Sequence, residues 1–187
     1  MMKRLAIHIT LFLPLIFLLV QLFIIEVNDP VKYIYTISGI VSTVILFFSI
    51  TISLIKKRVN LLKYRRAIGL WGFFYALVHM INFVVFDAQF DIYFILEETF
   101  DKPFIYLGMI AFFILLFMAA TSTRKLFRKY SKYHASVYLA LLLITIHFVM
   151  AQKTIDIDMF CYIAVILIIA YYKLLQIIVK NSKVYTS

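Results

Sequence analysis

The chain has 187 residues, of which 65% are hydrophobic and 15% are charged, and it contains only four glycines and three prolines. This composition is typical of long apolar helices and excludes a soluble globular domain. The formal net charge of +10 does not favour a nucleic-acid-binding protein, because the basic residues lie in short clusters beside apolar segments. The sequence therefore predicts an all-α integral membrane protein whose basic residues face the headgroups of a lipid bilayer.

Six apolar segments follow one another along the chain, each near the ~20 residues that a membrane-spanning helix requires. They cover residues 5–25, 34–55, 68–86, 104–122, 134–151 and 157–179. The first segment lacks a small-residue cleavage site, so we expect a retained span rather than a signal peptide. Because no repeat or long linker divides the sequence, we expect a single six-transmembrane-helix bundle over residues 1–187.

The charged residues between these segments are sorted by sign. Sixteen of the nineteen basic residues fall on one side of the expected bundle, and all nine acids fall on the other. By the positive-inside rule the basic side is cytoplasmic, so both termini are expected in the cytoplasm. The basic residues on that side are Lys3, Arg4, Lys56, Lys57, Arg58, Lys63, Arg65, Arg66, Arg124, Lys125, Arg128, Lys129, Lys132, Lys173, Lys180 and Lys183.

The longest outer loop, residues 87–102, mixes acids with aromatic and aliphatic side chains. This pattern predicts a short helix that lies in the membrane interface. Its carboxylates Asp91, Glu97 and Glu98 are candidates for docking a soluble or peripheral partner, because charged rims steer protein encounters. Topology and interfacial anchoring alone explain the same pattern.

Two histidines, His134 and His147, lie thirteen residues apart in the fifth segment. At about 1.5 Å per residue they are roughly 20 Å apart along a helix, about two-thirds of a hydrocarbon core of about 30 Å. His79 in the third segment has nearly the depth of His147, counted from the last cytoplasmic cation, so the two can face each other. Neutral imidazole binds haem iron, and these depths predict an outer haem between His79 and His147 and a second haem near His134.

An ideal helix does not fit this arrangement without adjustment. At about 100° per residue, the side chains of His134 and His147 point roughly 140° apart. Either the two haems are rotated about the bundle axis or the helix is locally distorted. Each histidine also has a simpler explanation, a hydrogen bond to a neighbouring helix.

The second ligand of an inner haem at His134 is left open by the sequence. At that level the third segment carries Arg65 and Arg66, and the candidates are His8, Met118 in the fourth segment, one of these arginines, or no ligand at all. The arginines also serve as topology anchors, or as partners of a haem propionate or a flavin phosphate. For His8, which lies near the interface, the structural explanation is favoured over ligation.

Other chemistries lack their signatures in this sequence. It contains no glycine-rich nucleotide-binding motif, no H-E-x-x-H motif and no carboxylate inside an apolar segment. A carboxylate within a span is what proton relays and ion-coupled transporters usually require. Electron transfer is therefore the favoured function, and a haem-free scaffold or small transporter is the alternative from another class.

Several short motifs occur in a specific order along nearly the whole chain. They are Asp29-Pro30-Val31-Lys32, the run from Arg65 to Trp71, Leu77-Val78-His79, Lys102-Pro103-Phe104, Thr121-Ser122-Thr123, and the run from His134 to His147. Together they resemble the MsrQ family, the haem-binding membrane subunits of bacterial periplasmic methionine sulfoxide reductase systems, within the ferric reductase-like transmembrane group. The resemblance implies one or two b-type haems ligated at His79, His134 and His147, an FMN, and a location in the bacterial inner membrane.

The resemblance also implies partners for electron transfer. A cytoplasmic flavin reductase or the quinone pool would supply electrons, and a periplasmic, molybdenum-containing MsrP-like subunit would use them to repair oxidised methionines. The wider group carries two histidines on each of two helices, whereas the third segment here contains only His79. A stand-alone ferric or oxygen reductase is the alternative within electron transfer.

Overall fold

The computed structural model describes residues 2–54 and 61–152, together with residues 160, 163, 164, 167, 168 and 171. The chain separates into two units, residues 1–147 and residues 148–187. Within the described residues, five helical stretches are long and apolar enough to cross a membrane, which makes this a multi-pass membrane protein. They are Arg4–Ile25, Pro30–Ile52, Leu62–Asp87, Pro103–Ala120 and Arg124–Ala151. Most of the sixth expected span, residues 157–179, lies outside the described residues.

All regular structure in the described part of the chain is helical. The α-helices are α1 (Met2–Val20), α2 (Pro30–Leu54), α3 (Arg65–Asn82), α4 (Ile92–Asp101), α5 (Pro103–Ala120), α6 (Arg124–Tyr130) and α7 (Val137–Ala151). Two π-helical turns, η1 (Gln21–Ile25) and η3 (Phe83–Asp87), extend α1 and α3, and two 3₁₀ turns, η2 (Leu62–Tyr64) and η4 (Ser131–Ser136), precede α3 and α7. Five predicted apolar segments are thus helices, whereas α6 lies in a region expected to be a basic loop.

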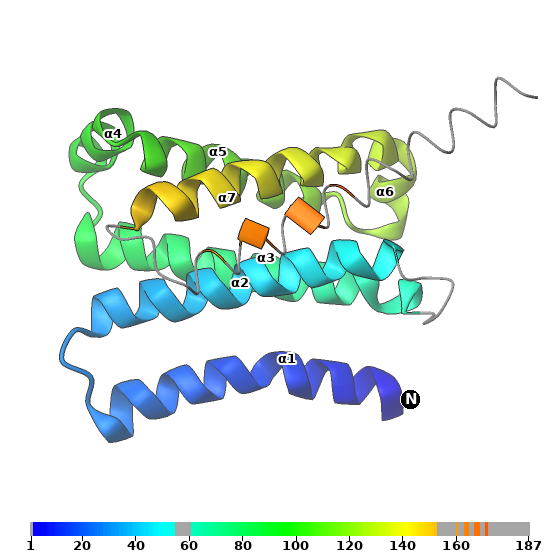
Figure 1. Cartoon of the computed structure of the whole chain (residues 1–187), viewed down its shortest axis with the longest axis horizontal. Coiled ribbons are helices and arrows are strands. Elements are labelled where there is room, and N and C mark those ends of the chain that lie inside the picture. The colour runs from blue at the N-terminus through cyan, green and yellow to red at the C-terminus, as the bar shows by residue number, and fades with distance from the viewer. Residues whose placement is uncertain are drawn as a thin grey trace, which may run out of the picture. The chain divides into compact units, whose positions relative to one another are not determined.

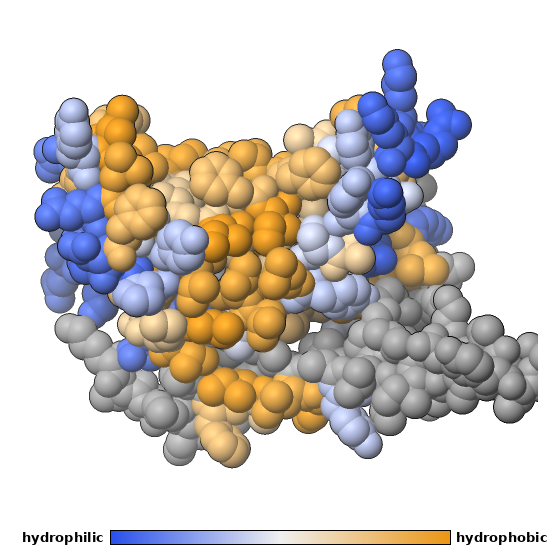
Figure 2. Space-filling model, turned by 90° about the horizontal axis from the view of Figure 1, so that it is seen from above, coloured by the Kyte–Doolittle hydropathy of each residue, from blue (hydrophilic) through white to orange (hydrophobic). Residues whose placement is uncertain are grey.

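The arrangement of the first unit separates its acidic and basic ends. In Figure 1, α1, α2, α3 and α5 run side by side, with α4 at one end of these helices and α6 at the other end, where α1 begins. On the face drawn in Figure 2, hydrophilic side chains gather at both margins and a hydrophobic band lies between them. This is the distribution that a bilayer requires, because charged side chains are expensive within hydrocarbon.

The packing of α2 against α3 relies on small residues. Four buried side chains at this contact form a cluster: Ile45, Ile52, Ile68 and Tyr75. The Ser42 hydroxyl donates to the carbonyl of Gly72 at 2.9 Å, and a Cβ added to Gly72 would lie 2.8 Å from the Leu46 side chain. Such close approach supplies the van der Waals contact that holds helices together in lipid. It fixes α3, which carries His79, against α2.

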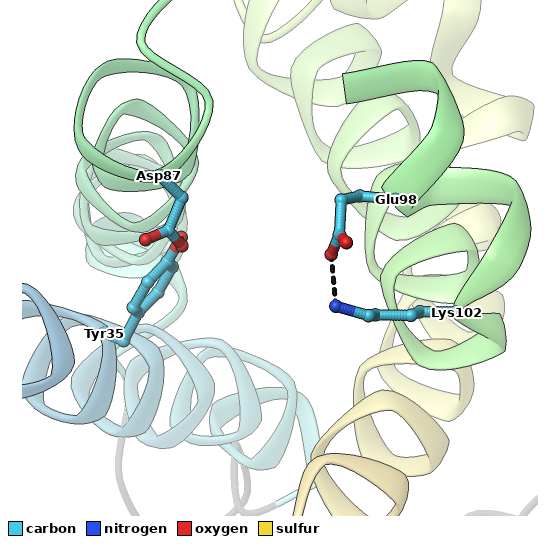
Figure 3. Close-up of polar contacts among 4 residues, drawn as sticks. All are labelled: Tyr35, Asp87, Glu98 and Lys102. Carbon is cyan, nitrogen blue, oxygen red and sulfur yellow. Dashed lines mark hydrogen bonds and ion pairs between the residues drawn. The ribbon is translucent and has the colours of Figure 1, made fainter. Parts of the chain in front are cut away.

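The short helix expected in the outer loop is present as α4. Its N-cap is Asp91, whose carboxylate accepts hydrogen bonds from the backbone N–H groups of Tyr93 at 2.9 Å and Phe94 at 3.2 Å. Glu98 forms an ion pair with Lys102 at the end of the same helix (Figure 3). Two of the three candidate docking carboxylates therefore have structural contacts within the loop.

Candidate functional site

The structure brings His79 of α3 and His147 of α7 together. Their ring centroids lie 6.2 Å apart, and the ring planes are nearly perpendicular at 85°. Both side chains are partly buried. The two residues come from different segments but from the same depth, as the count along the sequence predicts.

The hydrogen-bond partners of His79 define which ring nitrogen carries its hydrogen. Nδ1 lies 3.2 Å from the carbonyl oxygen of Tyr35 and 3.4 Å from the Ser38 hydroxyl. The carbonyl can only accept, and the Ser38 hydroxyl donates to the carbonyl of Ile34. Nδ1 must therefore be the donor, because neither partner has a hydrogen to give it. In the neutral ring this leaves the lone pair on Nε2.

His147 has the same arrangement on a different helix. Its Nδ1 lies 2.6 Å from the carbonyl oxygen of Phe104, at the start of α5. The carbonyl again accepts, so Nδ1 carries the hydrogen and Nε2 the lone pair. Metal-binding histidines usually donate their other N–H to a carbonyl or carboxylate, which fixes the ring and raises its basicity. Both rings therefore have the protonation pattern of a metal ligand.

Two such imidazoles can share one metal ion. Metal–nitrogen bonds of about 2 Å, plus about 1 Å from each nitrogen to its ring centre, give a centroid separation of about 6 Å. The separation of 6.2 Å agrees with this arrangement. No group of three or more His, Cys, Asp or Glu side chains in the described residues could hold a metal ion. Two imidazole ligands would suffice for haem iron, because the porphyrin supplies the other ligands.

A second candidate site is a cavity of about 590 Å³ between α3, α5 and the segment that precedes α7. Its volume lies within the range of roughly 300–1,000 Å³ typical of cofactor pockets. Four residues singled out in the sequence, Arg65, Arg66, Met118 and His134, line it together. Arg124 adds a third arginine to the lining. The lining of the cavity therefore combines three guanidinium groups with one imidazole and one thioether.

His134 is held by a neighbouring hydroxyl. Its Nε2 lies 3.0 Å from Oγ1 of Thr121, and that hydroxyl donates to the carbonyl of Phe117 at 2.7 Å. The single hydroxyl hydrogen is thereby used, so Thr121 accepts from His134 and Nε2 carries the hydrogen. Nδ1 is then the nitrogen of His134 with a lone pair. The ring also makes an edge contact with Phe127, at a centroid distance of 4.7 Å.

The angular mismatch between His134 and His147 is reduced by a local distortion. His134 lies in the 3₁₀ turn η4, and the regular α-helix starts only at Val137. A 3₁₀ turn rotates about 20° more per residue than an α-helix, which brings the two side-chain directions to roughly 80° apart. Of the two possibilities left open by the sequence, the structure contains the helix distortion.

His8 lies apart from both sites. It is absent from the residues that line the cavity, and its Nδ1 accepts a hydrogen bond from Nε1 of Trp71 at 2.9 Å. In the neutral ring the hydrogen of His8 is consequently on Nε2, the opposite pattern from that of His79 and His147. His8 therefore has a structural partner that ties α1 to α3.

Several residues that hold the histidines were not predicted. Tyr35 and Phe104 contact the histidines through their backbone carbonyls, which every residue has and which the order of side chains in a sequence therefore does not reveal. Thr121 was noted only as part of a motif, and its contact with His134 depends on how α5 meets η4. The available signals were the hydroxyl of Thr121 and the single glycines of two apolar segments, Gly39 in residues 34–55 and Gly108 in residues 104–122.

Comparison with known proteins places these residues in a family. Residues 55–151, about half of the chain, match the family described as "Ferric reductase like transmembrane component". Relatives from Brucella ovis and Brucella canis, each described as "Protein-methionine-sulfoxide reductase heme-binding subunit MsrQ", are 31% identical over 161 residues, which is 83% of this chain and 73% of the relative. A relative of the same description from Brucella melitensis is 30% identical. No solved structure matches the chain.

Proposed function

Because the chain belongs to the MsrQ family of ferric reductase-like transmembrane proteins, we propose that it is a cytochrome b that carries electrons across the inner membrane of a bacterium. Its acceptor would be a periplasmic, molybdenum-containing MsrP-like subunit that reduces methionine sulfoxide in oxidised proteins. Its donor would be a cytoplasmic flavin reductase or the quinone pool. The protein itself would act as a conduit, since substrate reduction belongs to the partner.

The observation that carries this proposal is the pairing of His79 with His147. Both imidazoles donate from Nδ1 to backbone carbonyls and keep Nε2 as a lone-pair donor, and their separation of 6.2 Å suits ligation of one iron. When bound there, a b-type haem would take up and release single electrons. The chain would supply both imidazole ligands, whose rings are fixed by the carbonyls of Tyr35 and Phe104.

The cavity at the other end of α3 supports a second cofactor site. We propose that His134 ligates an inner haem, with Met118, one of the arginines, or no residue as the second ligand. Arg65, Arg66 and Arg124 line the same cavity, and guanidinium groups pair bidentately with carboxylates and phosphates. They would hold the propionates of this haem or the phosphate of an FMN.

The test is the visible and electron paramagnetic resonance (EPR) spectrum of the purified protein and of alanine variants. The wild type should contain a low-spin b-type haem, and His79→Ala and His147→Ala should each remove the outer low-spin signal. Unchanged haem content and spectra in both variants would contradict the outer site. For the inner site, haem per protein should fall from two to one in His134→Ala. A ratio near one in both proteins would remove the inner haem from the proposal.

A further inference from the structure

Each histidine of the outer pair lies against a glycine of a neighbouring helix. A Cβ added to Gly39 of α2 would lie 3.2 Å from Nδ1 of His79. A Cβ added to Gly108 of α5 would lie 2.8 Å from Nδ1 of His147 and 3.0 Å from its Cε1. Both imidazoles therefore occupy space that any other residue at these positions would fill.

Each of the two glycines lies four residues after the residue whose backbone carbonyl a histidine contacts. His79 contacts the carbonyl of Tyr35, four residues before Gly39, and His147 contacts that of Phe104, four residues before Gly108. In an α-helix, the carbonyl of residue i accepts from the N–H of residue i+4. A carbonyl oxygen has a second lone pair, and a glycine at i+4 leaves it open to an approaching ring. The same local arrangement thus occurs twice, on two helices.

Ordinary helix packing does not explain these glycines. The sequence contains only four glycines, and each of these two is the single glycine of its helix. Glycine is a poor helix former relative to alanine, and in membrane helices it usually allows close contact between two helices. Around Gly72 the nearest atoms belong to Leu46 and Ile45, as that role predicts, whereas around Gly39 and Gly108 they belong to the imidazoles.

We propose that Gly39 and Gly108 are positioning residues for the two axial ligands of the outer haem, an inference that rests on the proposed function. Each glycine lets an imidazole donate its Nδ1–H to a helix carbonyl, so that Nε2 keeps the lone pair that would bind the iron. The hydrogen bond raises the basicity of the ligand. A more basic imidazole stabilises the ferric form more than the ferrous form, so the two glycines hold the potential of the outer haem down.

The experiment compares Gly108→Ala and Gly39→Ala with Gly72→Ala. In the first two variants the new methyl group meets a histidine, whereas in the third it meets Leu46 at 2.8 Å, the same distance as in Gly108→Ala. Gly72→Ala therefore controls for general damage to helix packing. The readouts are the EPR signal and midpoint potential of the outer haem, and the haem retained after purification in detergent.

Gly108→Ala should shift or remove the outer low-spin signal and weaken haem retention about tenfold, in line with the effect of removing outer-shell partners of metal ligands. If the binding of ferric haem is weakened tenfold more than the binding of ferrous haem, the midpoint potential rises by about 59 mV. Gly39→Ala should change the same readouts in the same direction but by less, because its methyl group would lie 3.2 Å from Nδ1 of His79, a milder contact. Gly72→Ala should keep the wild-type signal and potential.

The inference is overturned if Gly39→Ala and Gly108→Ala both keep the wild-type outer signal and potential while His79→Ala and His147→Ala lose them. It is also overturned if Gly72→Ala changes these readouts as much as Gly108→Ala. Should Gly108→Ala fail to accumulate in the membrane, Gly39→Ala decides by the same criteria. A wild type without a low-spin haem, or histidine variants with unchanged spectra, would instead reject the proposed function, and this inference with it.

Discussion

The hydroxyl of Tyr35 on α2 donates a hydrogen bond to the carboxylate of Asp87, the last residue of the π-helical turn η3 that follows α3 (Figure 3). Tyr35 also contacts His79 twice. Its backbone carbonyl oxygen lies 3.2 Å from Nδ1 of His79, and its ring makes an edge-to-face contact with the imidazole at a centroid distance of 5.1 Å. Tyr35 is thus fixed from both sides. The N-terminal end of α2 and the C-terminal end of α3 are tied together next to the proposed haem ligand.

Removing the Tyr35 hydroxyl should therefore weaken this end of the bundle without removing the haem. We expect Tyr35→Phe to lower the free energy of unfolding by about 1 kcal/mol, the value of one hydrogen bond near the surface, while haem content stays at the wild-type level because the carbonyl contact is retained. Thermal stability in detergent measures the first effect. Tyr93→Phe is the control, because Tyr93 is 86% exposed. Equal stability of the two variants would contradict the role of the Tyr35–Asp87 contact.

His8 should be dispensable for cofactor binding. Its Nδ1 accepts from Trp71, and it does not line the cavity. His8→Ala should keep the wild-type haem-to-protein ratio and spectrum, and should lower stability by about 1 kcal/mol because Trp71 loses its acceptor. Haem quantification and thermal unfolding measure the two effects. Loss of one haem in His8→Ala would instead make His8 a ligand of the inner site.

The orientation in the membrane can be tested at positions that the structure shows to be accessible. Tyr93 of α4 and Lys129 of α6 are both exposed and lie toward opposite ends of the apolar helices. Each is replaced by cysteine in a background where Cys161, the single native cysteine, is serine. In intact cells an impermeant thiol reagent should label position 93, and position 129 only after the inner membrane is opened. The reverse pattern would place the basic end in the periplasm, against the positive-inside rule.

The sequence predicts depth in the membrane well and direction around a helix poorly. A rise of about 1.5 Å per residue is enough to place His79 and His147 at one level, and the structure does bring these two side chains together. Direction around the axis depends on departures from the α-helix, such as η4 at His134 and η3 before Ala88. The sequence placed Arg65, Arg66 and Met118 near the level of His134, and all four line one cavity. The Thr121 contact could not be predicted, because it depends on the direction of the His134 side chain around the helix axis.

The docking surface proposed for the outer loop is best tested at Glu97. Asp91 caps α4 and Glu98 pairs with Lys102, so both acids have structural roles that can confound an effect on docking. Glu97 has no ion pair among the described residues. Asp91→Asn is a usable second variant, because asparagine caps a helix about as well as aspartate.

If α4 docks the periplasmic partner, Glu97→Gln should slow reoxidation of the reduced haem by that partner about threefold at low ionic strength, since charges near an interface act mainly on the association rate. The difference should shrink as salt is added, because screening weakens exposed charges. Stopped-flow absorbance at several salt concentrations measures both effects. Asp29→Asn is the control, since Asp29 is an exposed acid at the start of α2, away from α4 in the sequence. Equal rates for Glu97→Gln and the wild type at every salt concentration would exclude Glu97 from the docking surface, while equal slowing in Asp29→Asn would indicate a general effect of charge rather than docking on α4.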